Sequence, residues 1–188
     1  YNPTESKKIL KEIFKEDKKV NKLVKIYWKS KLNNICIIPA RANSKRIKDK
    51  NIKNFYGKTI IYWSILAAKK SKCFSKIIVS SDSKKILSIS EKFGAVKNNL
   101  RPKKISTDKS SMDDVIKYEI FKKNRKKKID NVCCIVATAP LISSKDIKKS
   151  LDILKRKKTN YVFSASAYDA PIDRYFLINK KGFLVKRK

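Results

Sequence analysis

From residue 34 onward, short apolar runs alternate with segments of helical pattern, and this alternation limits the possible folds more than any other feature. The apolar runs cover residues 35–38, 77–79 and 132–137, with no charged residue inside them. Such runs are typical of strands covered on both faces. The pattern therefore predicts an α/β fold with three layers, in which a mostly parallel sheet carries helices on both faces. A chain of 188 residues suits one domain of this kind.

The segments between these runs carry the signals of helix ends. Serine is a favoured N-cap residue, because its hydroxyl accepts a hydrogen bond from the first turn, and glycine readily ends a helix. The predicted helices cover residues 60–70, a segment from Ser83 to Gly94, a segment that begins at Ser110 or Ser111, and a segment from Ser143 or Ser144 to about residue 157. Residues 161–163 are predicted to form a fourth strand.

Residues 1–31 are predicted to form a basic, helical N-terminal extension, separate from a main domain at residues 32–188. Apolar residues recur near helical spacing among the lysines of this extension. A basic amphipathic helix can lie on an acidic membrane or bind a partner protein, but more often it packs its apolar stripe on its own domain. Because the chain begins at Tyr1 and ends in a basic run, we expect it to be part of a longer protein.

The net charge is +33, from 49 Lys and Arg residues against 16 Asp and Glu residues. Taken alone, this charge suggests a polyanionic partner such as a nucleic acid. The lysines, however, are spread over nearly every predicted helix, and Asn and Ile, whose codons are also A/T-rich, are abundant. Genome composition is therefore the favoured explanation. A nucleic acid is therefore not the predicted partner. No apolar run approaches membrane-spanning length, so a membrane is not predicted either.

Histidine is absent, which excludes Ser-His-Asp triads, Cys-His pairs and His-ligated zinc sites. The four cysteines have no Cys-x-x-Cys spacing, and three of them lie within apolar runs. Buried thiols in such runs act as small hydrophobic side chains. This usage of cysteine is typical of a reducing cytoplasm, which is the predicted location.

The loop after the first apolar run is basic, with Arg41, Lys45, Arg46 and Lys50. Ligands of parallel α/β folds bind beyond the carboxyl ends of the strands, which is where this loop stands. Fixed cations and backbone N–H groups at that place can surround a triphosphate. Neither the P-loop nor the dinucleotide fingerprint occurs in the chain. On chemistry alone, a solvated basic loop is an equally good interpretation of so lysine-rich a segment.

A series of motifs runs in order from residue 34 almost to the end of the chain. They are Ile38-Pro39-Ala40-Arg41-x-x-Ser44-Lys45, Lys50-Asn51, Ile77-Ile78-Val79-Ser80-Ser81-Asp82, Phe93-Gly94-Ala95, Leu100-Arg101-Pro102, Asp108, the run from Cys133 to Leu141, Tyr161-Val162-Phe163-Ser164 and Pro171-Ile172. Together they resemble the acylneuraminate cytidylyltransferase family, which comprises the CMP-sialic acid synthetases and their pseudaminic and legionaminic acid relatives. The resemblance implies a Rossmann-like fold of the nucleotide-diphospho-sugar transferase type. It also implies that residues 32–188 are the cytidylyltransferase domain without the family's C-terminal part.

The resemblance implies an enzyme that transfers CMP from CTP to a nine-carbon acidic sugar, with Mg²⁺ as cofactor and pyrophosphate as product. In the family the first loop binds CTP, and Lys50, with Arg41, would be catalytic by stabilising charge on the α-phosphoryl group. The residues that would bind CTP are Ala40, Arg41, Ser44, Lys45, Asn51, Arg101, Ser110 and Ser111. The family's acidic metal ligands and its dimer-forming segment come after the position of residue 188. We therefore expect a homodimer only for the complete protein, and weak metal binding with slow turnover for this chain.

Asp82, at the end of the second apolar run, is a weak candidate for a metal ligand or a base. A carboxylate at such a position more often fixes a turn or a helix start. The metal ligands of the chain are therefore left open.

The sugar is predicted from the segment at 136–141. Sialic acid enzymes usually carry Gln-Pro-Thr-Ser-Pro-Leu there, and their glutamine faces the sugar, whereas this chain has Val136 in that place. This segment and Pro171-Ile172-Asp173-Arg174 resemble the pseudaminic acid branch. The resemblance implies sugar contacts from Thr138, Ala139, Pro140 and Arg174. CMP-N-acetylneuraminate synthetase, legionaminate synthetase, an inactive remnant of the family and a basic nucleic-acid-binding domain are the alternatives.

Overall fold

The computed structural model of the chain describes residues 33–42, 44, 46–121, 128–166, 176–178 and 184–186. The predicted extension at 1–31 lies outside the described residues, as do Lys45 and Arg174. The chain divides into two compact units, residues 1–151 and residues 152–188.

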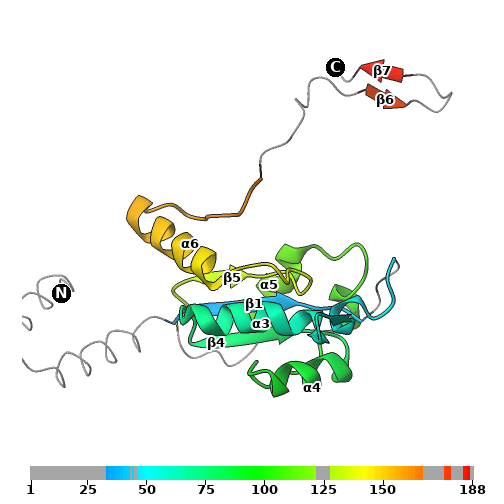
Figure 1. Cartoon of the computed structure of the whole chain (residues 1–188), viewed down its shortest axis with the longest axis horizontal. Coiled ribbons are helices and arrows are strands. Elements are labelled where there is room, and N and C mark those ends of the chain that lie inside the picture. The colour runs from blue at the N-terminus through cyan, green and yellow to red at the C-terminus, as the bar shows by residue number, and fades with distance from the viewer. Residues whose placement is uncertain are drawn as a thin grey trace, which may run out of the picture. The chain divides into compact units, whose positions relative to one another are not determined.

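The first unit is built on a parallel sheet of three strands, β1 (Ile35–Pro39), β4 (Lys76–Ser80) and β5 (Val132–Cys134). Their order is β4-β1-β5, so β1 is the central strand (Figure 1). One further parallel bridge joins Val96 to Ile78 of β4. The three apolar runs thus form the predicted parallel sheet.

Helices cover both faces of this sheet, as predicted (Figure 1). Alternate side chains of β1 point to opposite faces, because the side-chain period of a strand is two residues. Cys36 and Ile38 face a core with α3 (Ile60–Ser71), α4 (Lys84–Lys92) and the first turn of α6 (Ser144–Lys157). Ile35 and Ile37 face α5 (Met112–Phe121). The central strand is therefore buried on both sides.

The predicted caps are present at the starts of three helices. Ser83 accepts a hydrogen bond from the N–H of Ile86, and Gly94, with φ at 103°, follows the end of that helix. At α5 the cap is Ser111 rather than Ser110, because the Ser111 hydroxyl accepts from the N–H of Asp114 at 3.1 Å. The same arrangement at α6 makes Ser143 the cap, with its hydroxyl 3.1 Å from the N–H of Asp146.

A short hairpin follows the basic loop, where the sequence predicted only a polar loop. The 3₁₀ helix η1 (Lys50–Ile52) leads into strands β2 (Asn54–Phe55) and β3 (Lys58–Thr59). The two turn residues between them, Tyr56 and Gly57, both have positive φ, which is the geometry of a two-residue hairpin turn. The hairpin ends where α3 begins, and the N–H of Ile60 at the start of α3 donates to the carbonyl oxygen of Lys53, directly after η1, at 2.9 Å.

In the second unit, the prediction of a fourth strand at 161–163 is wrong. These residues pair with no described strand, and the side chains of Tyr161 and Phe163 are about three-quarters exposed and stack on each other. An apolar pattern alone does not make a strand, because the backbone needs a neighbour for its hydrogen bonds. The described strands of this unit are β6 (Phe176–Ile178) and β7 (Leu184–Lys186), which pair antiparallel. Across both units, none of the described helices is both long and apolar enough to traverse a bilayer.

Candidate functional site

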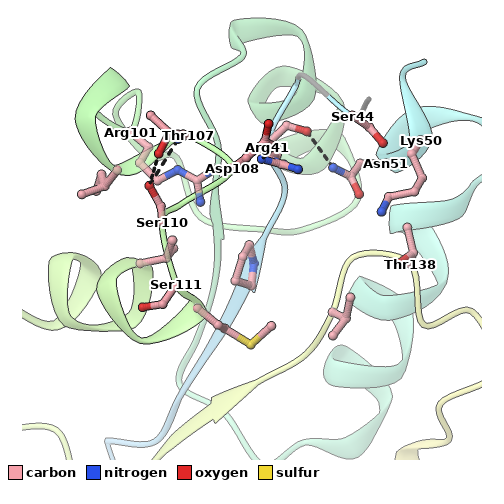
Figure 2. A pocket seen from close by; sticks show the side chains of 15 residues that line it. Arg41, Ser44, Lys50, Asn51, Arg101, Thr107, Asp108, Ser110, Ser111 and Thr138 are labelled. Atoms are coloured by element: carbon pink, nitrogen blue, oxygen red, sulfur yellow. Dashed lines mark hydrogen bonds and ion pairs between the residues drawn. The ribbon is translucent and has the colours of Figure 1, made fainter. Parts of the chain in front are cut away.

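A pocket of about 260 Å³ lies beyond the carboxyl ends of the parallel strands (Figure 2). Figure 2 shows the side chains of the loop after β1 on one side and those around the start of α5 on the other. The residues predicted to form the site that line this pocket are Arg41, Ser44, Lys50, Asn51, Arg101, Ser110, Ser111 and Thr138. Segments far apart in the sequence thus converge on one cavity.

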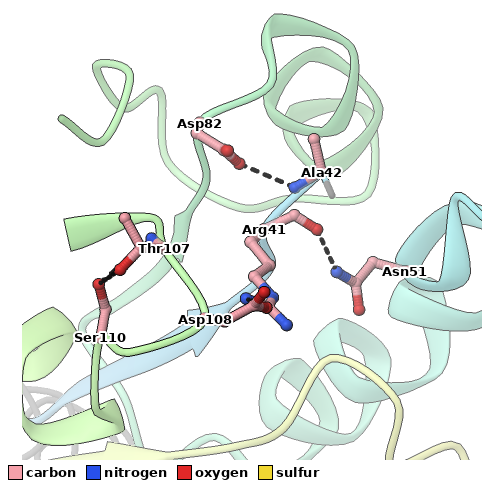
Figure 3. A network of polar contacts seen from close by, with 7 residues as sticks. All are labelled: Arg41, Ala42, Asn51, Asp82, Thr107, Asp108 and Ser110. Carbon is pink, nitrogen blue, oxygen red and sulfur yellow. Dashed lines mark hydrogen bonds and ion pairs between the residues drawn. The ribbon is translucent and has the colours of Figure 1, made fainter. Parts of the chain in front are cut away.

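The backbone of the loop after β1 is fixed from two sides (Figure 3). On the β4 side, the N–H of Ala42 donates to the carboxylate of Asp82 at 2.8 Å. On the other side, the side-chain amide of Asn51 donates to the carbonyl oxygen of Arg41 at 2.8 Å. Asn51 is itself buried, on η1. These two bonds hold both polar groups of the peptide unit between Arg41 and Ala42, so the backbone from which the Arg41 side chain starts has a defined position at the pocket.

Arg101 is the second cation of the pocket, and only 4% of its surface is exposed. Its N–H donates to the carbonyl of Ser81, and its Nε donates to the hydroxyl of Ser106 at 3.0 Å. Burial lowers the pKa of the guanidinium, while the nearby carboxylates of Asp82 and Glu119 act in the opposite direction. An arginine stays charged in proteins even so, and Arg101 therefore presents a fixed cation to the pocket.

A fully buried acidic residue, Glu119 of α5, lies behind this cation. Its Oε1 accepts a hydrogen bond from the side-chain amide of Asn98 at 3.2 Å, and the same amide donates to the carbonyl of Val79. Buried carboxylates are rare unless they are compensated. Sequence reasoning missed Glu119, because nothing in a lone glutamate on a helix shows that it points inward.

Arg41 forms an ion pair with Asp108 inside the pocket (Figures 2 and 3). The segment beside Asp108 is fixed, because the N–H of Thr107 donates to the hydroxyl of Ser110 and the two hydroxyl groups lie 3.0 Å apart. From the sequence, Asp108 was one of the family motifs but had no predicted role. The ion pair places this carboxylate at the pocket.

The loop after β5 forms the floor of the pocket through Val136 and Thr138. The hydroxyl of Ser64, which is completely buried on α3, lies 3.0 Å from the carbonyl oxygen of Val136. It also lies 3.3 Å from that of Ala137 and 3.5 Å from that of Ala139. A single side chain of α3 therefore anchors the whole turn. Sequence reasoning missed this role too, because serine within a helix is common.

The remaining predicted site residues lie elsewhere. Ala40 is fully buried in the hydrophobic core, next to the loop that it begins. Ala139 and Pro140 are half-buried and do not line the pocket. Arg46, from the same basic loop, is exposed and does not line the pocket either. The ligand contacts of Ala40, Ala139 and Pro140 stay predictions, as do those of Lys45 and Arg174.

The described residues do not form a metal cage. Among them, no three His, Cys, Asp or Glu side chains gather closely enough to hold an ion. The carboxylates of Asp82 and Asp108 are engaged by Ala42 and Arg41. Mg²⁺ needs oxygen ligands in near-octahedral geometry. The described residues therefore do not provide a preformed Mg²⁺ site.

The cysteines are structural. All four are free, and Cys36 and Cys133 are neighbours on β1 and β5. The adjacent thiol of Cys133 and burial raise the pKa of Cys36, and burial raises the pKa of Cys134 to about 11. None of the four lines the pocket. The predicted role of Cys36 as a small buried side chain in an apolar strand is confirmed.

Comparison with known proteins agrees with this architecture. A family model described as Cytidylyltransferase matches residues 35–172. Pseudaminic acid cytidylyltransferase of Campylobacter jejuni subsp. jejuni serotype O:2 is 36% identical over 152 residues, which are 80% of this chain and 66% of that protein. CMP-N,N'-diacetyllegionaminic acid synthase of Legionella pneumophila is 34% identical over 122 residues, 64% of this chain and 53% of that protein. The chain thus spans just under two thirds of the first of these relatives and about half of the second.

Solved structures also share the fold. The structure of CMP:2-keto-3-deoxy-manno-octonic acid synthetase complexed with CTP superposes with a TM-score of 0.56 at 19% sequence identity. The superposition covers 67% of this chain and 48% of that one. At this identity the likeness shows the fold, which is the predicted Rossmann-like α/β arrangement.

Proposed function

Since this chain belongs to the cytidylyltransferase family, we propose that its pocket binds CTP and transfers CMP to a nine-carbon acidic sugar. The hydroxyl oxygen at the anomeric carbon of the sugar forms a bond to the α-phosphorus of CTP, and the hydroxyl proton passes to water. The bond from the α-phosphorus to the bridging oxygen breaks, and pyrophosphate leaves. The cofactor in this proposal is Mg²⁺, and the reaction takes place in the cytoplasm. In the complete protein, residues 32–188 form the catalytic domain of a homodimer.

The observation that carries this proposal is the convergence of Arg41, Lys50 and Arg101 on one pocket at the carboxyl edge of the sheet. The start of α5, with Ser111 as its cap, lies at the same pocket. The N-terminus of a helix carries a partial positive charge and favours anions. Three cations and a helix start around one cavity suit a triphosphate.

The chemistry asks for positioning and electrostatic stabilisation rather than for an acid or a base. In the proposal, Arg41 and Arg101 hold the phosphates, and Lys50 stabilises the charge that develops on the α-phosphoryl group. Ser44, Asn51 and Ser110 line the same pocket, and in the proposal they contact the nucleotide. A chain without histidine meets this demand, because none of these side chains takes up a proton in the proposal and the hydroxyl proton of the sugar passes to water.

For the sugar we propose pseudaminic acid. Two observations support this choice: the name and 36% identity of the Campylobacter jejuni relative, and the lining of the pocket by Val136, where the sialic acid enzymes carry an amide. A legionaminic acid synthase matches a shorter part of the chain at 34% identity, which makes legionaminic acid the second candidate.

Selective binding of CTP is the first test of this proposal. The melting temperature of the protein is measured with CTP, UTP, ATP and GTP at equal concentration. We expect CTP to raise it by several degrees at about one hundred times its dissociation constant, where the stabilisation is about 2.7 kcal/mol, and the other three to raise it much less. Equal shifts with all four nucleotides would contradict a cytidine site.

The sugar is tested by product analysis. The protein, together with any segment that its gene encodes beyond Lys188, is incubated with CTP, Mg²⁺ and pseudaminic, legionaminic or N-acetylneuraminic acid in parallel. We expect CMP-pseudaminic acid to form fastest, as detected by mass spectrometry. Exclusive formation of CMP-N-acetylneuraminic acid would show that the interpretation of Val136 is wrong.

A further inference from the structure

The pocket that gathers the cations also contains a carboxylate. Of the described residues that line it, Asp108 alone is acidic, and it pairs with Arg41 (Figure 3). The side chains of the pair are 37% and 40% exposed, so both are in contact with water. A carboxylate beside a phosphate-binding cation repels the phosphate. The position of Asp108 in this pocket therefore needs a functional explanation.

We propose that Asp108 is an internal competitor for Arg41: its carboxylate occupies the guanidinium in the empty site and is displaced by the phosphates of the bound nucleotide. This inference rests on the proposed function, because it requires that Arg41 binds phosphate. The planar fork of an arginine matches a carboxylate and a phosphate equally well in shape. After the transfer, the returning carboxylate competes with pyrophosphate for Arg41 and so hastens its release.

Both partners are placed for such an exchange. The backbone of Arg41 is held by Asn51, and the segment of Asp108 is held by the bond between Thr107 and Ser110. The two backbones therefore keep their places while the side chains change partners. A half-exposed ion pair is weak, so a polyvalent anion such as pyrophosphate can replace the carboxylate.

A purely structural role for Asp108 predicts the opposite result. If the carboxylate only oriented Arg41 toward the ligand, its removal would leave the guanidinium poorly placed and would weaken binding. A competitor gives the reverse sign, because its removal frees the guanidinium and also removes a negative charge that faces the phosphates. The sign of the change in affinity thus separates the two roles.

The test is calorimetric titration of the protein with inorganic pyrophosphate. We expect Asp108→Asn, which keeps the shape and removes the charge, to tighten binding about tenfold. Glu91→Gln makes the same change of net charge at an exposed position of α4 outside the pocket and is expected to change the affinity less than about twofold. Unchanged or weaker binding by Asp108→Asn, or an equal gain with Glu91→Gln, would overturn the proposal. Asp108→Ser serves as a second charge-removing variant if the asparagine variant folds poorly.

The exchange is tested separately by repeating the substitution in an Arg41→Ala background. There the gain from Asp108→Asn is expected to fall to about threefold or less, because only direct repulsion of the phosphates remains. A full gain in that background would show that Asp108 acts without Arg41, and the inference would be wrong.

A separate titration with CTP and UTP distinguishes failure of this inference from failure of the proposed function. Loss of CTP selectivity would refute the cytidine site, whereas the pyrophosphate series decides the role of Asp108 by itself.

Discussion

Replacing Arg41 with alanine is expected to weaken the binding of CTP about a hundredfold. Hydrogen bonds to charged groups contribute about 1.5–3 kcal/mol each, and arginine can make two of them to one phosphate. The substitution also leaves the carboxylate of Asp108 without its cation, in a pocket meant for phosphates. Both effects act in the same direction, which is why this variant should show the largest loss of affinity. Titration with CTP measures it.

Two further variants make this result specific. Arg46→Ala removes an arginine from the same loop at an exposed position outside the pocket, and its affinity for CTP should stay within about twofold of the parent. Arg41→Lys keeps the charge but loses the planar fork, so about a tenfold loss is expected. Equal losses for Arg41→Ala and Arg46→Ala would mean that net charge, and not this site, attracts the nucleotide.

Replacing Glu119 with alanine is expected to lower the free energy of unfolding by about 3 kcal/mol, the largest effect on stability that we predict. The substitution removes the acceptor of the Asn98 amide and leaves a space in a fully buried place. It also removes one of the negative charges that favour the buried guanidinium of Arg101. Urea denaturation measures the change, with the slope of the transition as a check that the unfolded state is the same.

Matched variants separate the causes of this loss. Glu119→Gln keeps an oxygen acceptor for Asn98 and removes only the charge, so it should cost about half as much. Glu91→Ala truncates an exposed glutamate of α4 and should change stability by less than about 0.5 kcal/mol. If Glu119→Ala lowers the free energy of unfolding no more than Glu91→Ala does, the buried carboxylate does not stabilise the fold.

The sequence predicted the sheet well where apolar runs and strands coincide, and failed where they do not. β4 (Lys76–Ser80) covers the apolar run at 77–79 and one residue on each side of it. Both faces of β1 are covered by helices, as expected. β5 stops at Cys134, although the apolar run continues to Ala137, because the chain turns there to form the pocket floor. Apolar composition reports burial, and burial is shared by strands, turns and loops. The same limit explains the wrong strand at 161–163.

For the site, the sequence predicted the cations but not their partners. Arg41, Lys50 and Arg101 could be found because motifs and strand ends mark their places in the chain. The pairing of Arg41 with Asp108 could not, because it depends on how the strand order β4-β1-β5 brings distant loops together. Residues that act from behind the pocket, such as Ser64 and Glu119, leave no mark in a single sequence.

The contact of Ser64 with three carbonyl groups has a consequence for how the pocket floor can adapt. A hydroxyl group has one hydrogen, so Ser64 can make one strong bond at a time to Val136, Ala137 or Ala139. Rotation about the bond from Cβ to Oγ moves this hydrogen from one acceptor to another without breaking the anchorage. The turn that carries Thr138 can therefore shift slightly to fit ligands of different size in the pocket and still remain hydrogen-bonded to α3.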